Sequence, residues 1–278
     1  MAMTPWVALT LVGSLAAQGA LESPNPATTA GLRERQPASL EPGAPLATVA
    51  VGGYSQSVSN HNGIWQGLVL DTTWDPWKNG KFIGSLISTD RPMGSGVVGS
   101  IGKYQEFKGG YGFLGLATSK GADYLPTFQL VSDLNLDLPV PGLVLGGGYI
   151  YTRVRDLHEN HQLSLGPTYY FADFIGTVRL SMNRNNPGNQ DSTSTMVQLR
   201  HGAKDYQPWQ SFHITWGGEA YQNLLLHEAV TARGAGAGLD CFFPLAHDWT
   251  LQTGLEWGQK NAAYRLWGGS VRVGRMFR

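Results

Sequence analysis

The chain has 278 residues, and its 20 basic and 20 acidic side chains give a formal net charge of zero at pH 7. This balance excludes a protein that holds nucleic acid through a basic surface. The single cysteine excludes an intramolecular disulfide or a thiolate metal cage. Charged residues make up only 14% of the chain and 37 residues are glycine, which is unusual for a soluble enzyme and typical of a membrane β-protein.

Residues 1–20 are predicted to be a signal peptide. The apolar run WVALTLVGSLAAQGA, residues 6–20, is too short to span a bilayer as a helix, and its alanines fit a signal-peptidase site. No Lys or Arg precedes the run, so a buried N-terminal helix is the alternative. Residues 21–46 contain five prolines and little apolar patterning, which predicts a Pro-rich linker.

From residue 47 to residue 278 the sequence alternates between apolar and polar residues with period two, which predicts strands. In 128–138, for example, the leucines share one face, and Gln129, Asp133 and Asp137 share the other. Because glycines blur the alternation between Gly94 and Gly115, twelve strands is the alternative to fourteen. The fourteen strands are predicted near residues 48–59, 63–75, 80–91, 94–105, 109–119, 125–138, 142–153, 159–171, 173–184, 192–203, 208–220, 229–242, 247–259 and 264–277.

The length of these strands favours an antiparallel up-and-down transmembrane β-barrel over a soluble secreted β-sandwich that binds a ligand. The predicted strands have roughly 10 to 14 residues, whereas soluble strands average about five or six. An even strand number puts both barrel termini on the periplasmic side of the bacterial outer membrane. Aromatic residues near the predicted strand ends suggest interfacial girdles: Trp74, Trp77, Tyr104, Tyr169, Tyr170, Phe171, Trp209, Phe242, Phe243 and Trp249.

Several stretches, taken in order, resemble the YaiO-type family of outer-membrane β-barrels over residues 48–278. The resemblance implies a barrel in the outer membrane of a Gram-negative bacterium, in contact with membrane lipid and lipopolysaccharide, and carries no established activity onto individual residues. The C-terminal alternation up to Phe277 is typical of the signal that the outer-membrane assembly machinery recognises. The matching stretches are DYLP (123–126), GLVLGGGYIYTRVRD (142–156), HQLSLGPTYYFADFIGTVRLSMN (161–183), STSTMVQLRHGAKDYQPW (192–209) and RVGRMF (272–277).

Three motifs suggest chemistry, and each has a simpler interpretation. Two GxGxxG runs, at 94–99 and 110–115, precede strands and not the helix that a dinucleotide site needs. His158 and His161 are three residues apart, not the four of a zinc metalloprotease helix, so a polar loop is favoured over a metal or headgroup site. Ser211 and His213 share a lumen face with no acid evident nearby, which argues against an outer-membrane acyl hydrolase. No cofactor, metal or catalytic residue is therefore predicted.

The charged and polar residues on the inward alternation are predicted to line the lumen, while Cys241 faces the lipid. Among the charged lumen residues six acids face three bases, so either the charges pair across a filled interior or an acid-biased passage favours cations. We expect a passive narrow channel for a small polar solute, or a membrane scaffold, and a lipid- or lipopolysaccharide-modifying enzyme is the alternative. The lumen candidates are Asp71, Gln129, Asp133, Asp137, Arg179, Arg200, His213, Glu219, Asp240, Glu256 and Arg272.

Overall fold

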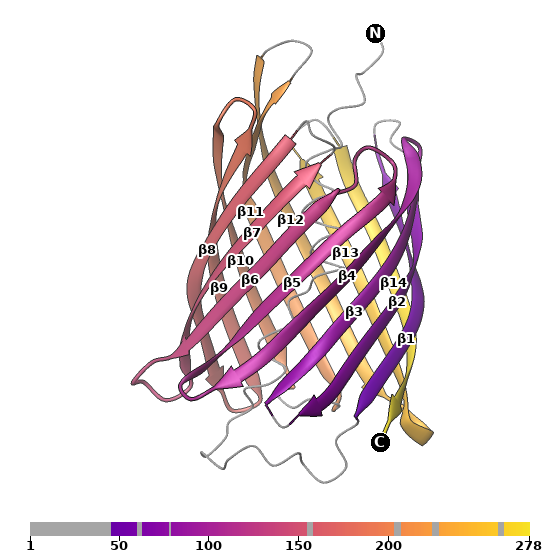
Figure 1. Cartoon of the computed structure of the whole chain (residues 1–278), viewed down its shortest axis with the longest axis vertical. Coiled ribbons are helices and arrows are strands. Elements are labelled where there is room, and N and C mark those ends of the chain that lie inside the picture. The colour runs from indigo at the N-terminus through magenta and orange to yellow at the C-terminus, as the bar shows by residue number, and fades with distance from the viewer. Residues whose placement is uncertain are drawn as a thin grey trace.

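The computed structural model is a closed β-barrel of fourteen antiparallel strands, each paired with its neighbours in the sequence (Figure 1). It describes residues 46–59, 63–77, 79–154, 158–202, 207–223, 228–260 and 264–278. The predicted signal peptide and nearly all of the predicted linker lie outside these residues. The strands are β1 (Ala47–Val58), β2 (Gly63–Trp77), β3 (Gly80–Arg91), β4 (Gly94–Phe107), β5 (Gly110–Gly121), β6 (Phe128–Asp137), β7 (Leu143–Val154), β8 (His158–Phe171), β9 (Phe174–Asn186), β10 (Gln190–His201), β11 (Trp209–Asn223), β12 (Glu228–Pro244), β13 (Trp249–Lys260) and β14 (Tyr264–Phe277).

The barrel closes where the first strand pairs with the last. β1 and β14 are antiparallel in continuous register, from Ala47 opposite Phe277 to Val58 opposite Leu266. Both barrel ends therefore lie at one rim, which we call the terminal rim and which is the lower end in Figure 1. The other end is called the opposite rim. Closure leaves no strand edge unpaired. The predicted number of fourteen strands is confirmed.

The outward face of the barrel is apolar. Leu68 is 68% exposed and Leu255 is 63% exposed, and many other large apolar side chains of the described residues are exposed in the same way. A soluble protein does not expose a continuous apolar belt of this size, whereas a transmembrane barrel presents one to the lipid. Members of this belt are Leu68, Leu86, Ile101, Leu114, Leu134, Leu165, Leu180, Phe212, Leu255 and Val271. No helix in the described part of the chain is long and apolar enough to cross a membrane.

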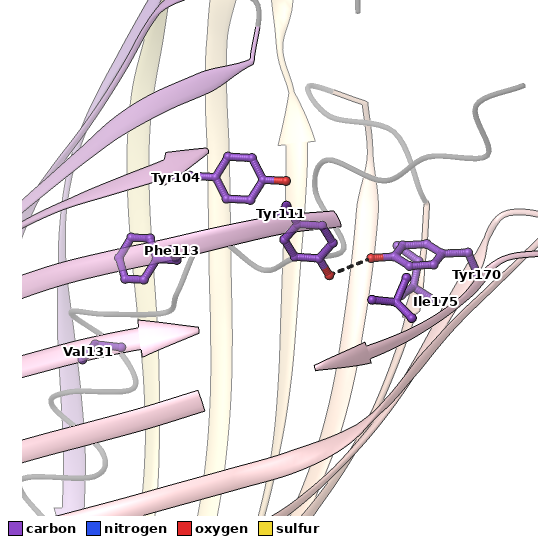
Figure 2. Close-up of a cluster of buried hydrophobic side chains, with 7 residues drawn as sticks. Tyr104, Tyr111, Phe113, Val131, Tyr170 and Ile175 are labelled. Atoms are coloured by element: carbon purple, nitrogen blue, oxygen red, sulfur yellow. Dashed lines mark hydrogen bonds between the residues drawn. The ribbon is translucent and has the colours of Figure 1, made fainter. Parts of the chain in front are cut away.

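An aromatic cluster fills part of the interior. Tyr111 from β5 and Tyr170 from β8 point toward one another with their hydroxyl oxygens 3.3 Å apart (Figure 2). Two strands lie between β5 and β8 in the sheet, so this contact crosses the inside of the curved wall. Tyr104 packs on Tyr111, with ring centroids 5.6 Å apart. The cluster consists of Tyr104, Tyr111, Phe113, Val131, Val144, Tyr170 and Ile175.

The cluster corrects the predicted aromatic girdle. Tyr104 and Tyr170 are only 2% and 5% exposed, so they belong to the interior and not to the membrane interface. Both residues lie near the ends of their strands, as predicted, but the alternation of each strand decides which side a residue faces. Trp74, Phe171 and Trp249 are exposed on the outer surface, as a girdle requires.

A second interior region lies toward the opposite rim, where the segment between β5 and β6 folds inward. Tyr124 and Leu125 in this segment are 2% and 1% exposed, and the Tyr124 hydroxyl donates to the Gly94 carbonyl oxygen at 2.9 Å. A side chain at Gly96 would collide with Leu125, which explains one of the GxGxxG glycines. The strand predicted to begin at residue 125 begins instead at Phe128. Leu125 is apolar because it packs inside the barrel, as Tyr124 does, and not because it belongs to a strand.

Candidate functional site

The candidate site is the polar part of the barrel interior, and its best-defined element is an ion pair between β6 and β9. Arg179 Nη2 lies 3.3 Å from Asp133 Oδ2, and the two side chains are 10% and 13% exposed. The same nitrogen donates to the Asn135 side-chain oxygen at 2.9 Å, and Asn135 donates to Asp133 at 3.1 Å. Gly146 on β7 provides room, because a Cβ there would collide with the Arg179 guanidinium and the Asn135 oxygen.

A second polar group spans β13, β14, β1, β2 and β3. Arg272 Nη1 lies 3.4 Å from Asp71 Oδ2, and Asp71 accepts a hydrogen bond from Ser85 at 2.6 Å. Gln56 on β1 donates to Glu256 on β13 at 2.9 Å. Arg272 and Asp71 lie on β14 and β2, which are separated by β1. Gln56 and Glu256 lie on β1 and β13, which are separated by β14. Both contacts therefore reach across the inside of the wall.

Asp240 and His213 continue this group onto β12 and β11. Asp240 interacts electrostatically with both His213 and Arg272. Asp240 is the register partner of Ser211. The Ser211 and His213 pair therefore has an acid nearby, contrary to the expectation from the sequence. Ser211 is nevertheless 2% exposed, and its hydroxyl accepts a hydrogen bond from Gln198 at 2.8 Å. These positions support a structural hydrogen-bond group on the inner wall.

The remaining lumen candidates are distributed around the wall. Gln129 donates to Thr152 at 2.9 Å inside the barrel. Arg200 is 1% exposed, and its guanidinium lies 4.5 Å from the Trp209 ring centroid. Asp137 is exposed near the end of β6, at the terminal rim. The backbone of Glu219 lies in β11, but its side chain is outside the described residues.

Three buried cations were missing from the predicted lumen set. Lys81, Arg91 and Lys260 are 7%, 7% and 3% exposed. The Lys81 ammonium lies 5.5 Å from the Tyr104 ring centroid. With Arg179, Arg200 and Arg272 the three cations make six interior bases for the six predicted acids, of which Glu219 has its side chain outside the described residues. This count favours a charge-balanced interior over an acid-biased one. On β3 the inward alternation carries isoleucines beside Lys81 and Arg91, while the outward one carries both Leu86 and Asp90. Because apolar and charged residues occur on both faces, the sequence does not show which face is inward.

Arg91 lies between two aromatic rings near the opposite rim. Its guanidinium carbon is 4.2 Å from the Trp65 ring centroid and 4.8 Å from that of Tyr124. Trp65 also contacts Tyr264 edge to face at 6.2 Å. Cation–π contacts of this kind are stronger when the cation is desolvated. Arg91 therefore ties the inward-folded β5–β6 segment to the wall formed by β14 and β2.

The His158 and His161 motif does not form a metal site. The two residues lie on opposite alternations of β8, and His161 Nδ1 is 2.8 Å from the Tyr149 hydroxyl oxygen. Within the described residues no group of three or more His, Cys, Asp or Glu side chains is placed to hold a metal ion. Both GxGxxG runs lie within strands β4 and β5, where they make no phosphate-binding loop.

A closed antiparallel barrel, a lipid-facing apolar belt and a polar interior together define a transmembrane β-barrel of the bacterial outer membrane. Residues 47–222 match the family model of the YaiO membrane β-barrel domain. The chain therefore belongs to the YaiO family of outer-membrane barrels, and the terminal rim is the periplasmic one. No curated protein matches the chain.

Solved structures resemble the chain at low sequence identity. A bacterial polysaccharide outer membrane secretin matches with a TM-score of 0.51 at 11% identity, covering 84% of this chain and 99% of the other. An anion-selective porin from Comamonas acidovorans matches with a TM-score of 0.42 at 12% identity, covering 83% and 98%. A loop-deletion mutant of OmpT from Vibrio cholerae matches with a TM-score of 0.46 at 10% identity, covering 82% and 98%.

Proposed function

We propose that this protein is a passive, narrow channel for small polar solutes across the outer membrane. The observation that carries the proposal is the two-sided interior. From β3 to β9 the inner wall carries packed aromatic and aliphatic side chains. From β11 to β3 it carries the polar group of Asp71, Asp240, Glu256 and Arg272, whose side chains retain partial exposure. On the first side the Arg179 and Asp133 ion pair is nearly buried, so the partly exposed groups of the second side offer a polar solute the hydrogen-bonding path.

The mechanism is diffusion without a covalent step. Carboxylates, guanidinium groups and amides along the polar side replace part of the hydration shell of a passing solute. The aromatic cluster limits the cross-section, because fourteen strands enclose a lumen between the filled small barrels and the wide porins. Since acids and bases balance inside, we expect weak ion selectivity and not the cation preference that an acid excess produces.

A non-conducting scaffold is the second candidate, and the contacts across the interior favour it. The Tyr111 to Tyr170 contact and the Arg179 to Asp133 pair both bridge β-strands that are three apart. An enzyme is not proposed, because Ser211 is buried and bonded to Gln198. The assembly machinery that reads the last strand and the small polar solute are the partners that the channel proposal implies.

Conductance of the purified barrel in a planar bilayer tests the proposal, after a heat-shift gel shows that the barrel is folded. We expect small discrete current steps for the wild type. Tyr170→Ala removes one side of the cross-lumen contact and should enlarge the steps. Tyr169→Ala is the matched control, because Tyr169 is 45% exposed on the outer surface, and it should leave them unchanged. A folded barrel without steps in the wild type and in Tyr170→Ala contradicts the channel and supports the scaffold.

A further inference from the structure

The inner wall of β8, β9 and β10 carries uncharged amide and hydroxyl side chains toward the opposite rim, and the strand register aligns them in two rows. The row nearer the rim is Asn160, Asn185 and Gln190, and the next row is Gln162, Asn183 and Ser192. We call these six residues the amide wall. They alternate with Leu163 and Met182, which are 56% and 58% exposed on the outer surface, so the amide wall faces the lumen.

Hydrogen bonds hold part of the amide wall in place and leave capacity for a solute. The Asn160 side chain donates to the Asn185 side-chain oxygen at 2.9 Å, and the Gln162 side chain donates to the Ser181 hydroxyl at 3.3 Å. A primary amide has two N–H donors and one acceptor oxygen, so these bonds use only part of what each amide offers. Because Asn160, Gln162 and Asn183 are partly exposed, their remaining donors and acceptors are accessible from the lumen.

On the side that faces the amide wall across the barrel, the inside of the opposite rim is packed. β2 lies seven strands from β9 in either direction round the barrel (Figure 1). Trp65 on β2 and Tyr264 on β14 are 2% and 3% exposed. Tyr124 and Leu125 of the inward-folded segment form a neighbouring cluster, and Met93 packs against both clusters. A solute that enters at this rim therefore meets its accessible polar surface on the β9 side.

Partly exposed polar side chains continue from the amide wall toward the polar group at Asp240. Ser194 follows Ser192 on the inward alternation of β10, and the neighbouring β11 adds Thr215 and His213 on its own inward alternation. His213 interacts electrostatically with Asp240. The polar surface therefore runs obliquely through the barrel, from β8–β10 at the opposite rim to the polar group on β11–β3.

We propose that the amide wall selects uncharged, hydroxyl-rich solutes, the chemical class of small sugars and sugar alcohols, as they enter the lumen at the opposite rim. The inference rests on the proposed channel and adds its substrate class. A sugar hydroxyl both donates and accepts hydrogen bonds, and so does a primary amide, so the wall replaces part of the hydration that such a solute loses. An ion gains no opposite charge from these six side chains, and the loss of its hydration costs far more.

Swelling of liposomes that contain the full-length barrel tests the proposal, with glucose as the uncharged probe and gluconate and glucosamine as charged probes of similar size. We expect the wild type to admit glucose faster than either charged probe. Gln162→Leu with Asn183→Leu removes two amides at nearly constant side-chain size and should slow glucose entry by about fivefold or more. Because simple narrowing slows all three probes alike, the ratio of glucose entry to gluconate entry should fall as well.

The matched control is Thr193→Leu with Thr195→Leu, which also adds two leucines to this part of the wall but on its outer face. The register partners of these threonines, Met182 and Leu180, are 58% and 52% exposed. A heat-shift gel shows that each variant is folded, and the control variant should admit all three probes as the wild type does.

Two results overturn the inference. One is wild-type entry of either charged probe as fast as glucose, and the other is an unchanged ratio of glucose to gluconate entry in the folded Gln162 and Asn183 variant. Conductance in a planar bilayer separates this inference from the proposed function. A wild type that conducts ions without preferring glucose overturns the inference and leaves the channel standing, whereas a folded barrel that passes neither ions nor sugars contradicts the channel itself.

Discussion

Removal of Arg179 should destabilise the barrel far more than removal of an exposed arginine. Arg179→Ala leaves the Asp133 carboxylate, which is 13% exposed, without its cation. Breaking a buried ion pair in this way costs about 3–5 kcal/mol. The pair makes a 3.3 Å contact, and Asn135 continues to donate to Asp133. Both facts place the expected loss of unfolding free energy near the lower end, about 3 kcal/mol.

Arg184→Ala is the matched control, because Arg184 also pairs with an aspartate but is 57% exposed. Its expected cost is about 0.5 kcal/mol. The assay is equilibrium unfolding in denaturant from lipid vesicles without lipopolysaccharide, followed by tryptophan fluorescence. Arg179→Ala combined with Asp133→Asn should recover part of the loss, since no charge is then left unpaired. Equal stability of the Arg179 and Arg184 variants would refute the reasoning.

Three further predictions test the alternation of the wall. Gly146→Ala should destabilise the barrel by about 1–3 kcal/mol through crowding of the β6–β9 ion pair. Gly147→Ala should be near neutral in the same unfolding assay, because a Cβ there would make only ordinary van der Waals contacts. Cys241, on the alternation of exposed Leu239, should react with a lipid-soluble thiol reagent and resist a charged one, and the reverse pattern would place it in the lumen. Tyr124→Phe removes the hydroxyl bond to Gly94 and should lower the unfolding free energy by about 1 kcal/mol, whereas Tyr124→Ala should also expose the β5–β6 segment to protease.

Strand number and outward residues were predictable because both follow from local alternation. A membrane strand with Leu134 on one face and Asp133 on the other can only place the leucine toward the lipid and the aspartate toward the lumen. The interior partners were not predictable in the same way. Arg179 meets Asp133 because the wall curves between β6 and β9, and no spacing in the sequence encodes that curvature. Tyr170 follows exposed Tyr169 in the alternation of β8, so its inward side was predictable, but its hydroxyl partner on β5 was not.

The role of the glycines in the GxGxxG runs was likewise not predictable from the sequence. Gly96 is small because Leu125 packs against it from the inward-folded segment. The sequence contains both residues, but only the folded chain brings them together. Arg91 was missed in the lumen set because its contacts with Trp65 and Tyr124 come from elements on either side of β3. Local pattern predicts which face a residue occupies, and packing decides what it meets there.

The pairing of β1 with β14 has a consequence for biogenesis. Thirteen of the fourteen strand pairs join consecutive strands, so they form through short-range contacts. The fourteenth pairs β1 with β14 and places Ala47 opposite Phe277. Non-local pairing of this kind slows folding, because chain entropy is lost before the contact is made. Until the last strand is synthesised and delivered, the growing sheet has two open edges and an exposed apolar face, which are prone to aggregation. Completion of this barrel is therefore a single late event, and loss of β14 would leave an aggregation-prone sheet and not a smaller pore.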